Sequence, residues 1–241
     1  MSITATAVPI LSDNYAWLLR DEATGATAIV DPADPAPIIA AIEGAGGRLD
    51  MILLTHHHGD HVAGTDDVRA RFGASVVGAA ADEHRLPKLD RAVRDGDTVA
   101  LGDSVATVID TPGHTRGHIA YHFPDGGVLL CGDTLFSLGC GRLLEGTAAE
   151  MFASLRKFAA LPGETLVCCG HEYTQSNARF ALSVDGANAA LKARAAEVDR
   201  LRAAGKATVP STMAAEMAEN PFMRAPDAAS LADIRARKDK F

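Results

Sequence analysis

Four histidines and one aspartate occur within seven residues of this chain, in the stretch Thr55-His56-His57-His58-Gly59-Asp60-His61. The apolar run at residues 51–54 comes directly before it and predicts a short buried strand. The stretch therefore lies on a loop at the carboxyl end of a strand, where open α/β sheets place their ligand sites. Imidazole nitrogens and carboxylate oxygens suit zinc and iron. His56 and His58 can give one ion two nitrogens, and the Asp60-His61 pair then indicates a second ion.

Three other predicted strand ends carry the same kind of side chain. In each, an apolar run leads into a glycine beside a histidine or an aspartate, and the glycine lets the backbone turn that side chain over the sheet edge. These side chains are His114, Asp133 and His171. A solvated polar loop is the alternative interpretation for any one of them, but four sites with one pattern favour a metal centre.

The candidate ligands divide between two ions. His56, His58 and His114 would give a tetrahedral ion three nitrogens and leave its fourth position open, as catalytic zinc requires. The second ion would be held by Asp60, His61 and His171. Asp133 can bridge the two, since ions in two-metal sites lie about 3.5–4 Å apart. We expect His57 to point away from the ions, and His118 to be either a residue behind the ligands or a buried structural histidine.

Composition limits the class of protein. The chain has 241 residues, 47% of them hydrophobic, and a net charge of −8, which argues against nonspecific binding to nucleic acid or to an anionic membrane. No apolar run approaches a membrane span, and the start Met1-Ser2-Ile3-Thr4-Ala5 lacks the basic and apolar regions of a secretory signal. The four cysteines show no C-x-x-C spacing. We therefore expect reduced thiols and a cytoplasmic location.

Clusters of predicted strands separated by helices indicate an α/β fold with two sheets and helices outside them. The predicted strands cover residues 3–11, 15–20, 26–31, 51–55, 74–78, 98–101, 105–110, 118–123, 127–131 and 165–169. Predicted helices cover residues 35–45 and 147–161, and a third follows the histidine loop through Arg71. Residues 80–96 are polar and loop-like.

Past Tyr173 the composition becomes rich in alanine and charged residues, without a convincing strand. Helices are predicted at residues 177–183, 188–204, 211–218 and 228–238, with Ser211 as a candidate N-cap. We therefore predict a metal-binding catalytic domain at residues 1–173 and a small all-α domain at residues 174–241.

The motifs T-H-x-H-x-D-H, T-P-G-H-T, G-D-T and G-H-E-Y-T resemble the signature of the metallo-β-lactamase fold hydrolases. Within that superfamily the chain looks like the glyoxalase II family, the hydroxyacylglutathione hydrolases, over essentially its full length. The specific parts are residues 133–136, 139–142 and 145–147 of the loop that follows the predicted strand at 127–131, together with residues 170–174, 220–224 and 235–241. The resemblance implies a four-layer αββα sandwich, with an α-helical C-terminal domain that helps to bind substrate.

The same resemblance implies a thioester hydrolase that converts S-D-lactoylglutathione, a 2-hydroxyacylglutathione, and water to glutathione and D-lactate in methylglyoxal detoxification. A hydroxide that bridges two divalent metal ions would attack the thioester, with Asp60 and Asp133 as catalytic residues. Zinc is the expected ion, with iron or manganese as alternatives. The family's glutathione contacts match Arg142, Tyr173, Arg235 and Lys238. Leu144 stands where the family usually has an aromatic residue, so affinity or substrate range is expected to differ.

Three alternatives remain open at this point. Another hydrolase of the same fold would act on a lactone, a lactam or a phosphodiester, and the negative net charge argues against a nuclease. A persulfide dioxygenase would use a single iron, whereas the complete Asp60, His61 and His171 set favours two ions. A metal-storage protein would close its coordination shell. As partners we expect only the small glutathione thioester, with no nucleic acid and no membrane, and we expect a monomer.

Overall fold

The computed structural model describes residues 3–241, which form two compact units. The first unit comprises the described residues up to Asp110 together with residues 117–132, and the second comprises residues 111–116 and 133–241. Met1 and Ser2, which belong to the stretch inspected for a secretory signal, lie outside the described residues. The boundary predicted after Tyr173 separates a catalytic domain from a substrate-binding domain. These compact units do not test that boundary, which stays a prediction.

The first unit contains a six-stranded mixed sheet with the strand order β1-β2-β3-β4-β5-β6. Its first three strands pair antiparallel and its last four pair parallel. The strands are β1 (Ile3–Ile10), β2 (Asn14–Asp21), β3 (Thr27–Val30), β4 (Met51–Leu53), β5 (Ser75–Ala79) and β6 (Arg91–Val93). Because β3 and β4 are parallel neighbours, the residues after them, Asp31 and Thr55, emerge at the same edge of the sheet.

Four antiparallel strands of the same unit form a second layer, in the order β10-β9-β8-β7. They are β7 (Thr98–Leu101), β8 (Ser104–Asp110), β9 (Ile119–Phe123) and β10 (Val128–Gly132). The buried Tyr121 hydroxyl donates to the Leu54 carbonyl over 3.0 Å, and the Ser104 hydroxyl donates to the Asp21 carboxylate over 2.6 Å. These two bonds link the layers, so the two sheets face each other.

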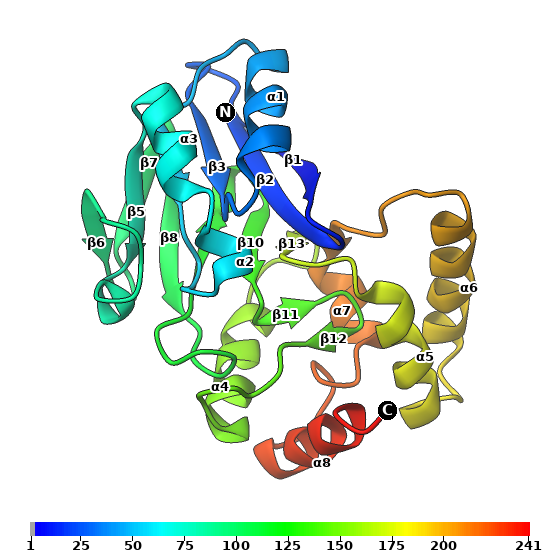
Figure 1. Ribbon diagram of the computed structural model, residues 1–241. Coiled ribbons are helices and arrows are strands. Elements are labelled where there is room, and N and C mark those ends of the chain that lie inside the picture. The colour runs from blue at the N-terminus through cyan, green and yellow to red at the C-terminus, as the bar shows by residue number, and fades with distance from the viewer. Residues whose placement is uncertain (1–2) are drawn as a thin grey trace. The chain divides into compact units, whose positions relative to one another are not determined.

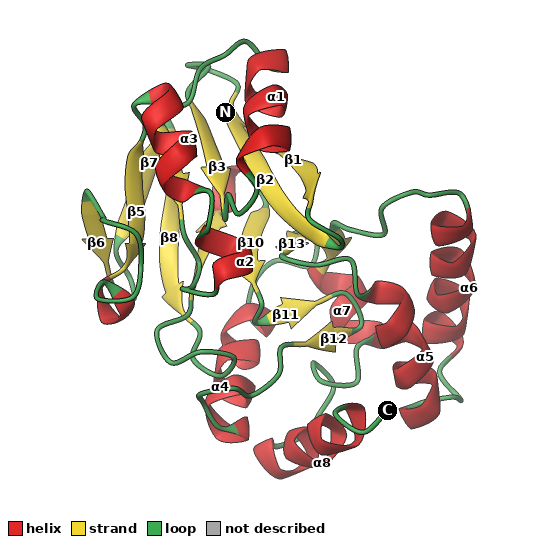
Figure 2. Cartoon of the chain, in the orientation of Figure 1, coloured by secondary structure: helices red, strands yellow, loops and turns green. Residues whose placement is uncertain are grey.

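Two helices cover the other face of the first sheet, α1 (Pro35–Gly44) and α3 (Thr65–Phe72) (Figure 2). Proline begins α1, where its missing N–H costs nothing. Ile38 and Ile42 of α1 and Val68 of α3 are fully buried in one cluster with side chains of β1 to β5. Burying one such side chain is worth about 1.5–3 kcal/mol. Three layers of the predicted sandwich, helix, sheet and sheet, therefore lie within this unit.

The helix predicted from the histidine loop through Arg71 is wrong as a single element. It consists of α2 (Gly59–Val62) and α3, with a break at Ala63 and Gly64. A Cβ atom on Gly64 would lie 2.6 Å from the Pro32 carbonyl oxygen and 2.9 Å from Pro35 Cδ. The chain thus passes against the backbone of the segment before α1, an approach that only glycine permits. That close approach explains both the glycine and the break.

The stretch at residues 80–96, predicted as a loop, contains ordered elements. A 3₁₀ turn, η1 (Ala80–Asp82), is followed by β6, which extends the parallel part of the first sheet. A second 3₁₀ turn, η2 (Pro124–Gly126), joins β9 to β10. All four cysteines are buried thiols. Among the described residues, no helix combines the length and apolar character needed to cross a membrane.

The second unit is mainly helical, with two short strand pairs (Figure 1). The hairpin of β11 (Leu135–Phe136) and β12 (Gly139–Cys140) lies among its helices, and β13 (Leu166–Cys169) pairs antiparallel with β14 (Ser211–Thr212). A capping box between Thr147 and Glu150 begins the first helix. The helices are α4 (Ala148–Ala159), α5 (Thr174–Val184), α6 (Ala189–Ala203), α7 (Met213–Glu219) and α8 (Ala228–Lys238).

Several predictions in this unit need correction. The β11–β12 hairpin was predicted as a loop, and a two-residue strand, β14, occurs past Tyr173 where none was expected. Ser211 pairs with Val167 in that strand, and Thr212 is the residue that caps α7, by accepting from the Ala215 amide. Pairing with β13 extends the backbone at Ser211, so the cap moves one residue along. The helix predicted at 228–238 is confirmed.

We predict that Gly64→Ala destabilises the protein by about 1–3 kcal/mol, because the added methyl group has no room beside the Pro32 carbonyl. Gly44→Ala is the matched control, since a Cβ there meets nothing within 4 Å, and it should leave stability unchanged or slightly higher. Urea denaturation measures both. Equal midpoints for the two variants would contradict this explanation of the break between α2 and α3.

Candidate metal centre and substrate pocket

In the first unit, the buried carboxylate of Asp31 organises the histidine loop. It accepts hydrogen bonds from the Thr55 amide at 2.9 Å and the Thr55 hydroxyl at 2.7 Å, and its Oδ2 lies 3.0 Å from His61 Nδ1. Asp31 has φ 53°, in the left-handed region, where a residue other than glycine is strained. Three bonds to one carboxylate offset that strain. They hold the start of the loop and leave His61 Nε2 on the side of the Asp60 carboxylate, 3.7 Å from it.

The ring nitrogens of His56 and His58 point at each other. Thr55 donates its hydroxyl proton to Asp31, so its oxygen accepts from His56 Nδ1–H at 3.0 Å. That network leaves His56 Nε2 without a proton, and it lies 3.0 Å from His58 Nδ1. Neutral imidazoles with converging nitrogens form the kind of donor pair that a zinc or iron ion accepts.

Asp60 and His61 lie next to each other on α2. The Asp60 carboxylate is 3.7 Å from His61 Nε2 and is about half exposed. The buried Asn14 holds it, since its amide donates to both the Asp60 carbonyl and the Asp60 carboxylate over 3.0 Å. Asp60 therefore combines access to solvent with a fixed orientation.

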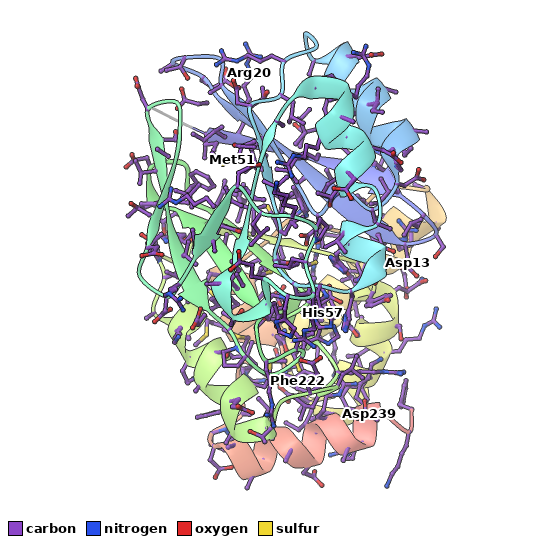
Figure 3. All side chains as sticks on the ribbon, turned by 60° about the vertical axis from the view of Figure 1, so that its left-hand side comes forward. Asp13, Arg20, Met51, His57, Phe222 and Asp239 are labelled. Atoms are coloured by element: carbon purple, nitrogen blue, oxygen red, sulfur yellow. The ribbon has the colours of Figure 1, made fainter. Side chains whose placement is uncertain are left out.

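His57 turns away from its two neighbours, as expected from the sequence. Its Nδ1 lies 3.2 Å from the buried carboxylate of Asp82, which Arg85 also contacts. Figure 3 labels Met51, at the start of β4, and His57, on the loop that follows this strand. His118 is buried, and its ring stacks on His56 with centroids 4.8 Å apart. Both histidines support the loop.

In the second unit, Asp133 lies between two histidines. Its Oδ2 is 3.5 Å from His114 Nε2 and 3.3 Å from His171 Nε2, and all three side chains are buried. The Nδ1–H of His114 donates to the Arg142 carbonyl over 2.9 Å, which directs its Nε2 toward Asp133. The Tyr173 ring stacks on His171 with centroids 4.5 Å apart. Each imidazole is thus held by a group other than Asp133.

The spacing of these donor atoms fits a metal ion. Charge-assisted hydrogen bonds between nitrogen and carboxylate oxygen are about 2.7–2.9 Å long, shorter than either contact to Asp133. Two ligand atoms bound to a tetrahedral ion at 2.0–2.2 Å lie about 3.3–3.6 Å apart. Asp133 is therefore spaced from both imidazoles as a carboxylate would be when it shares an ion with each.

A pocket of about 540 Å³ lies wholly within the second unit. His114 and Asp133 form part of its wall. Three cations also line it, Arg142, Arg235 and Lys238, although the whole chain carries net negative charge. The remaining lining residues are Phe136, Cys140, Tyr173, Ser176, Asn177, Asp239 and Phe241. A pocket lined by three cations and by two candidate ligands suits an anionic substrate.

Arg235 and Lys238 differ in how the protein uses them. Arg235 is buried and donates to the Cys140 carbonyl over 2.9 Å and to Asp239, labelled past α8 in Figure 3, over 3.0 Å. Lys238 is partly exposed and donates to the hydroxyl and carbonyl of Ser176. Burial lowers the pKa of Lys238, and the charges of Arg235 and Arg142 lower it further. An anion beside Lys238 would relieve that repulsion.

Sequence reasoning missed Asp31, Asn14 and Asp82 as supports of the site. Asp31 carries the same signal as the predicted ligands, an aspartate directly after an apolar run, but it was counted only as the last residue of the predicted strand at 26–31. Asn14 and Asp82 have no such signal, because their partners lie 46 and 25 residues away along the chain. Leu144, the departure from the family pattern, is exposed.

Comparison with known proteins defines the class first. Residues 11–171 match the model of the metallo-β-lactamase superfamily, and residues 172–241 match that of the hydroxyacylglutathione hydrolase C-terminus. The crystal structure of ETHE1 from Myxococcus xanthus is 26% identical, with a TM-score of 0.72 over 98% of this chain and 90% of that one. A di-iron-bound form of TTHA1623 is 28% identical, with a TM-score of 0.59 over 70% and 91%.

A curated hydroxyacylglutathione hydrolase from Acidiphilium cryptum is 60% identical, over 99% of this chain and 97% of that protein. The chain belongs to the hydroxyacylglutathione hydrolases, or glyoxalase II family, thioester hydrolases of the metallo-β-lactamase superfamily. The α/β sandwich with a helical C-terminal region and the class of enzyme predicted from the sequence are confirmed. Two divalent metal ions suit the His/Asp groups and this family.

We predict that Asp31→Asn destabilises the protein by about 3 kcal/mol, because an amide nitrogen would face donors that now share one carboxylate. Asp34→Asn is the control, since Asp34 makes no side-chain cap bond to α1. Thermal unfolding of both variants measures the difference. A similar melting temperature for Asp31→Asn and the wild type would show that this carboxylate does not organise the loop.

Proposed function

We propose that the protein hydrolyses S-D-lactoylglutathione to glutathione and D-lactate, the second step in the detoxification of methylglyoxal. Family membership supports the reaction class, and the name of the Acidiphilium relative supports this substrate. The observation that carries the proposal is the cation-lined pocket with His114 and Asp133 in its wall. Glutathione has two carboxylates, which the cations of this pocket can bind. The candidate metal ligands in the same pocket can then lie near the thioester.

Seven residues are proposed to hold two zinc ions, with iron or manganese as alternatives. His56, His58 and His114 would hold one ion, Asp60, His61 and His171 would hold the other, and Asp133 would serve as a ligand of both. The His56–His58 spacing and the spacing of Asp133 from two imidazoles support this assignment. When bound, the ions supply Lewis-acid polarisation of the carbonyl and lower the pKa of the attacking water.

The chain's own residues orient the reactants. We assign Asp60 to accept a hydrogen bond from the attacking water, and Asn14 keeps its carboxylate in a fixed direction. Asp133 presents a negative group between two histidines, and the Arg142 carbonyl and the Tyr173 ring hold those histidines in place. Water adds to the thioester carbon and the carbon–sulfur bond breaks. The leaving thiolate is the weak conjugate base of a fairly acidic thiol, so it departs with little need for protonation.

Four residues are proposed to bind the glutathione part of the substrate: Arg142, Tyr173, Arg235 and Lys238. The exposed Arg142 and the half-buried Lys238 can each offer a donor to a carboxylate, and Tyr173 can offer its hydroxyl. Arg235 contributes charge while its guanidinium holds Cys140 and Asp239. We further propose that the protein acts as a cytoplasmic monomer, without a nucleic-acid or membrane partner, and that residues 174–241 form the substrate-binding domain.

A thioester hydrolysis assay tests the proposed reaction. Metal-loaded protein should release glutathione and D-lactate from S-D-lactoylglutathione, with the lactate identified by a stereospecific dehydrogenase. A β-lactam, a lactone and a phosphodiester are assayed in parallel, because other enzymes of this fold hydrolyse such compounds. Turnover of one of these, without turnover of the thioester, would refute the proposal.

We predict that Asp133→Ala releases both ions and abolishes turnover, because Asp133 is the one carboxylate assigned to both. His57→Ala should keep nearly all its metal and its rate, since its ring contacts Asp82 instead. Elemental analysis and the thioester assay on the same samples measure both variants. Comparable losses in the two would mean that the ligands are wrongly assigned.

We predict that Lys238→Ala raises KM for lactoylglutathione about 10-fold and leaves kcat nearly unchanged, as expected for loss of a charge-assisted bond that acts equally in ground and transition states. The exposed Arg237, the adjacent cation on α8, provides the matched control as Arg237→Ala. A small thioester without carboxylates should be indifferent to both changes. If Lys238→Ala impairs both substrates equally, its role is structural.

A further inference from the structure

The short β11–β12 hairpin pairs over only two residues of each strand, and side chains from the helical segment at residues 174–241 also hold it. In the turn at residues 136–140, each of the five residues has one backbone N–H or C=O group that hydrogen-bonds to a side chain more than 35 residues away in sequence. The bonds run from Asn177 to the Ser137 carbonyl (3.1 Å), from the Leu138 amide to Glu216 (2.9 Å), from Asn220 to the Phe136 and Gly139 carbonyls (3.2 and 2.9 Å), and from Arg235 to the Cys140 carbonyl (2.9 Å).

Glu216 and Asn220 are the centre of this arrangement. Both are almost completely buried, and the Asn220 amide also donates to Glu216 over 2.9 Å. Desolvation raises the pKa of Glu216 above its ordinary value, and hydrogen bonds, including those from the Leu138 amide and Asn220, offset only part of that shift. A carboxyl group is costly to bury unless donors satisfy it. These two residues on and after α7 are therefore tied to the hairpin.

The hairpin itself adopts a strained shape. Leu138 has φ 60°, in the left-handed region, although its side chain is buried in an apolar cluster with α5 and α6. A left-handed residue other than glycine costs about 1–2 kcal/mol. At Gly139 a Cβ atom would lie 2.5 Å from the Asn177 amide nitrogen. The helical segment thus imposes this turn, because the turn is unfavourable by itself.

The hairpin connects directly to two candidate ligands. It begins two residues after Asp133 and leads into Gly141, where a Cβ atom would lie only 2.0 Å from the Asp133 carbonyl oxygen. The next residue is Arg142, whose carbonyl accepts the hydrogen bond from His114. A shift of the turn would therefore move both the backbone beside Asp133 and the acceptor that orients His114.

We propose that Glu216 and Asn220 are positioning residues for the metal centre, which fix the turn at residues 136–140 and thereby hold Asp133 and His114 in the arrangement that binds metal. This inference rests on the metal ligands assigned under the proposed function. It gives the helical segment a second role, independent of substrate contact. Removing a residue that orients a metal ligand typically weakens metal affinity 10- to 100-fold.

Cobalt binding to the chelated full-length protein tests this role without any substrate. Co²⁺ is titrated into the wild type, Glu216→Ala, Glu216→Gln and Glu219→Ala, and its visible d–d absorption reports affinity and coordination geometry. Glutamine keeps an oxygen that can accept from Leu138 and Asn220. Glu219→Ala removes a carboxylate from the same helix, α7, and no hydrogen bond from Glu219 to the hairpin is found among the described residues.

Glu216→Ala should bind Co²⁺ at least about 10-fold more weakly and with an altered spectrum, while Glu216→Gln and Glu219→Ala match the wild type. Unchanged binding by Glu216→Ala, or equal losses in Glu216→Ala and Glu219→Ala, would overturn the proposal, as would a wild type that binds no Co²⁺. If Glu216→Ala does not fold, Asn220→Ala, which removes the bonds to the Phe136 and Gly139 carbonyls, decides in the same way. A wild type that binds Co²⁺ but leaves lactoylglutathione intact would refute only the proposed reaction.

Discussion

A buried carboxylate between two imidazoles is the interaction on which the rest of the second unit depends. Asp133 lies 3.3 and 3.5 Å from two histidine nitrogens, too far for strong hydrogen bonds and close enough to share metal ions with them. Such a group is stable in a protein interior only when its neighbours are held in place. The Arg142 carbonyl holds His114 and the Tyr173 ring holds His171, so each candidate ligand is held by a residue that also lines the cation-lined pocket.

A buried carboxylate has a similar role in the first unit, where Asp31 sets the direction of the histidine loop. Asp31 is strained, buried and triply hydrogen-bonded, and through Thr55 it also sets which nitrogen of His56 carries the proton. The ligand-type residues of both units therefore depend on a layer of acceptors behind them. Metal-binding proteins generally tune their sites in this layer, because it controls ligand orientation and basicity.

Sequence reasoning identified most of the fold and the candidate ligands, because both leave local signals. A strand followed by glycine and a histidine or aspartate is visible within a few residues, as at His114 and His171, and the family motifs extended that interpretation over the whole chain. The tight turn at Leu138 and the break at Gly64 were missed. Their causes, side chains from α7 and the Pro32 carbonyl, lie far away in sequence or act through the backbone. Asn14 and Asp82 were missed for the same reason.

The helical segment illustrates what only three-dimensional structure reveals. Its composition predicted helices, and the resemblance implied glutathione contacts on α8. The structure adds that Arg235 donates hydrogen bonds to the Cys140 carbonyl and to Asp239. Lys238, which is partly exposed and donates to Ser176, is therefore the more accessible of the two cations. The proposed substrate contacts and the proposed support of the metal centre thus come from neighbouring residues of one segment.

The central claim is a two-metal thioester hydrolase, and titrating zinc into chelated protein tests it most directly. Hydrolysis of lactoylglutathione is followed in the same samples in which bound metal is counted. The account predicts no turnover without metal and a rate that reaches its plateau at two equivalents per chain. Full activity in the metal-free protein, or a plateau reached at one equivalent, would contradict it.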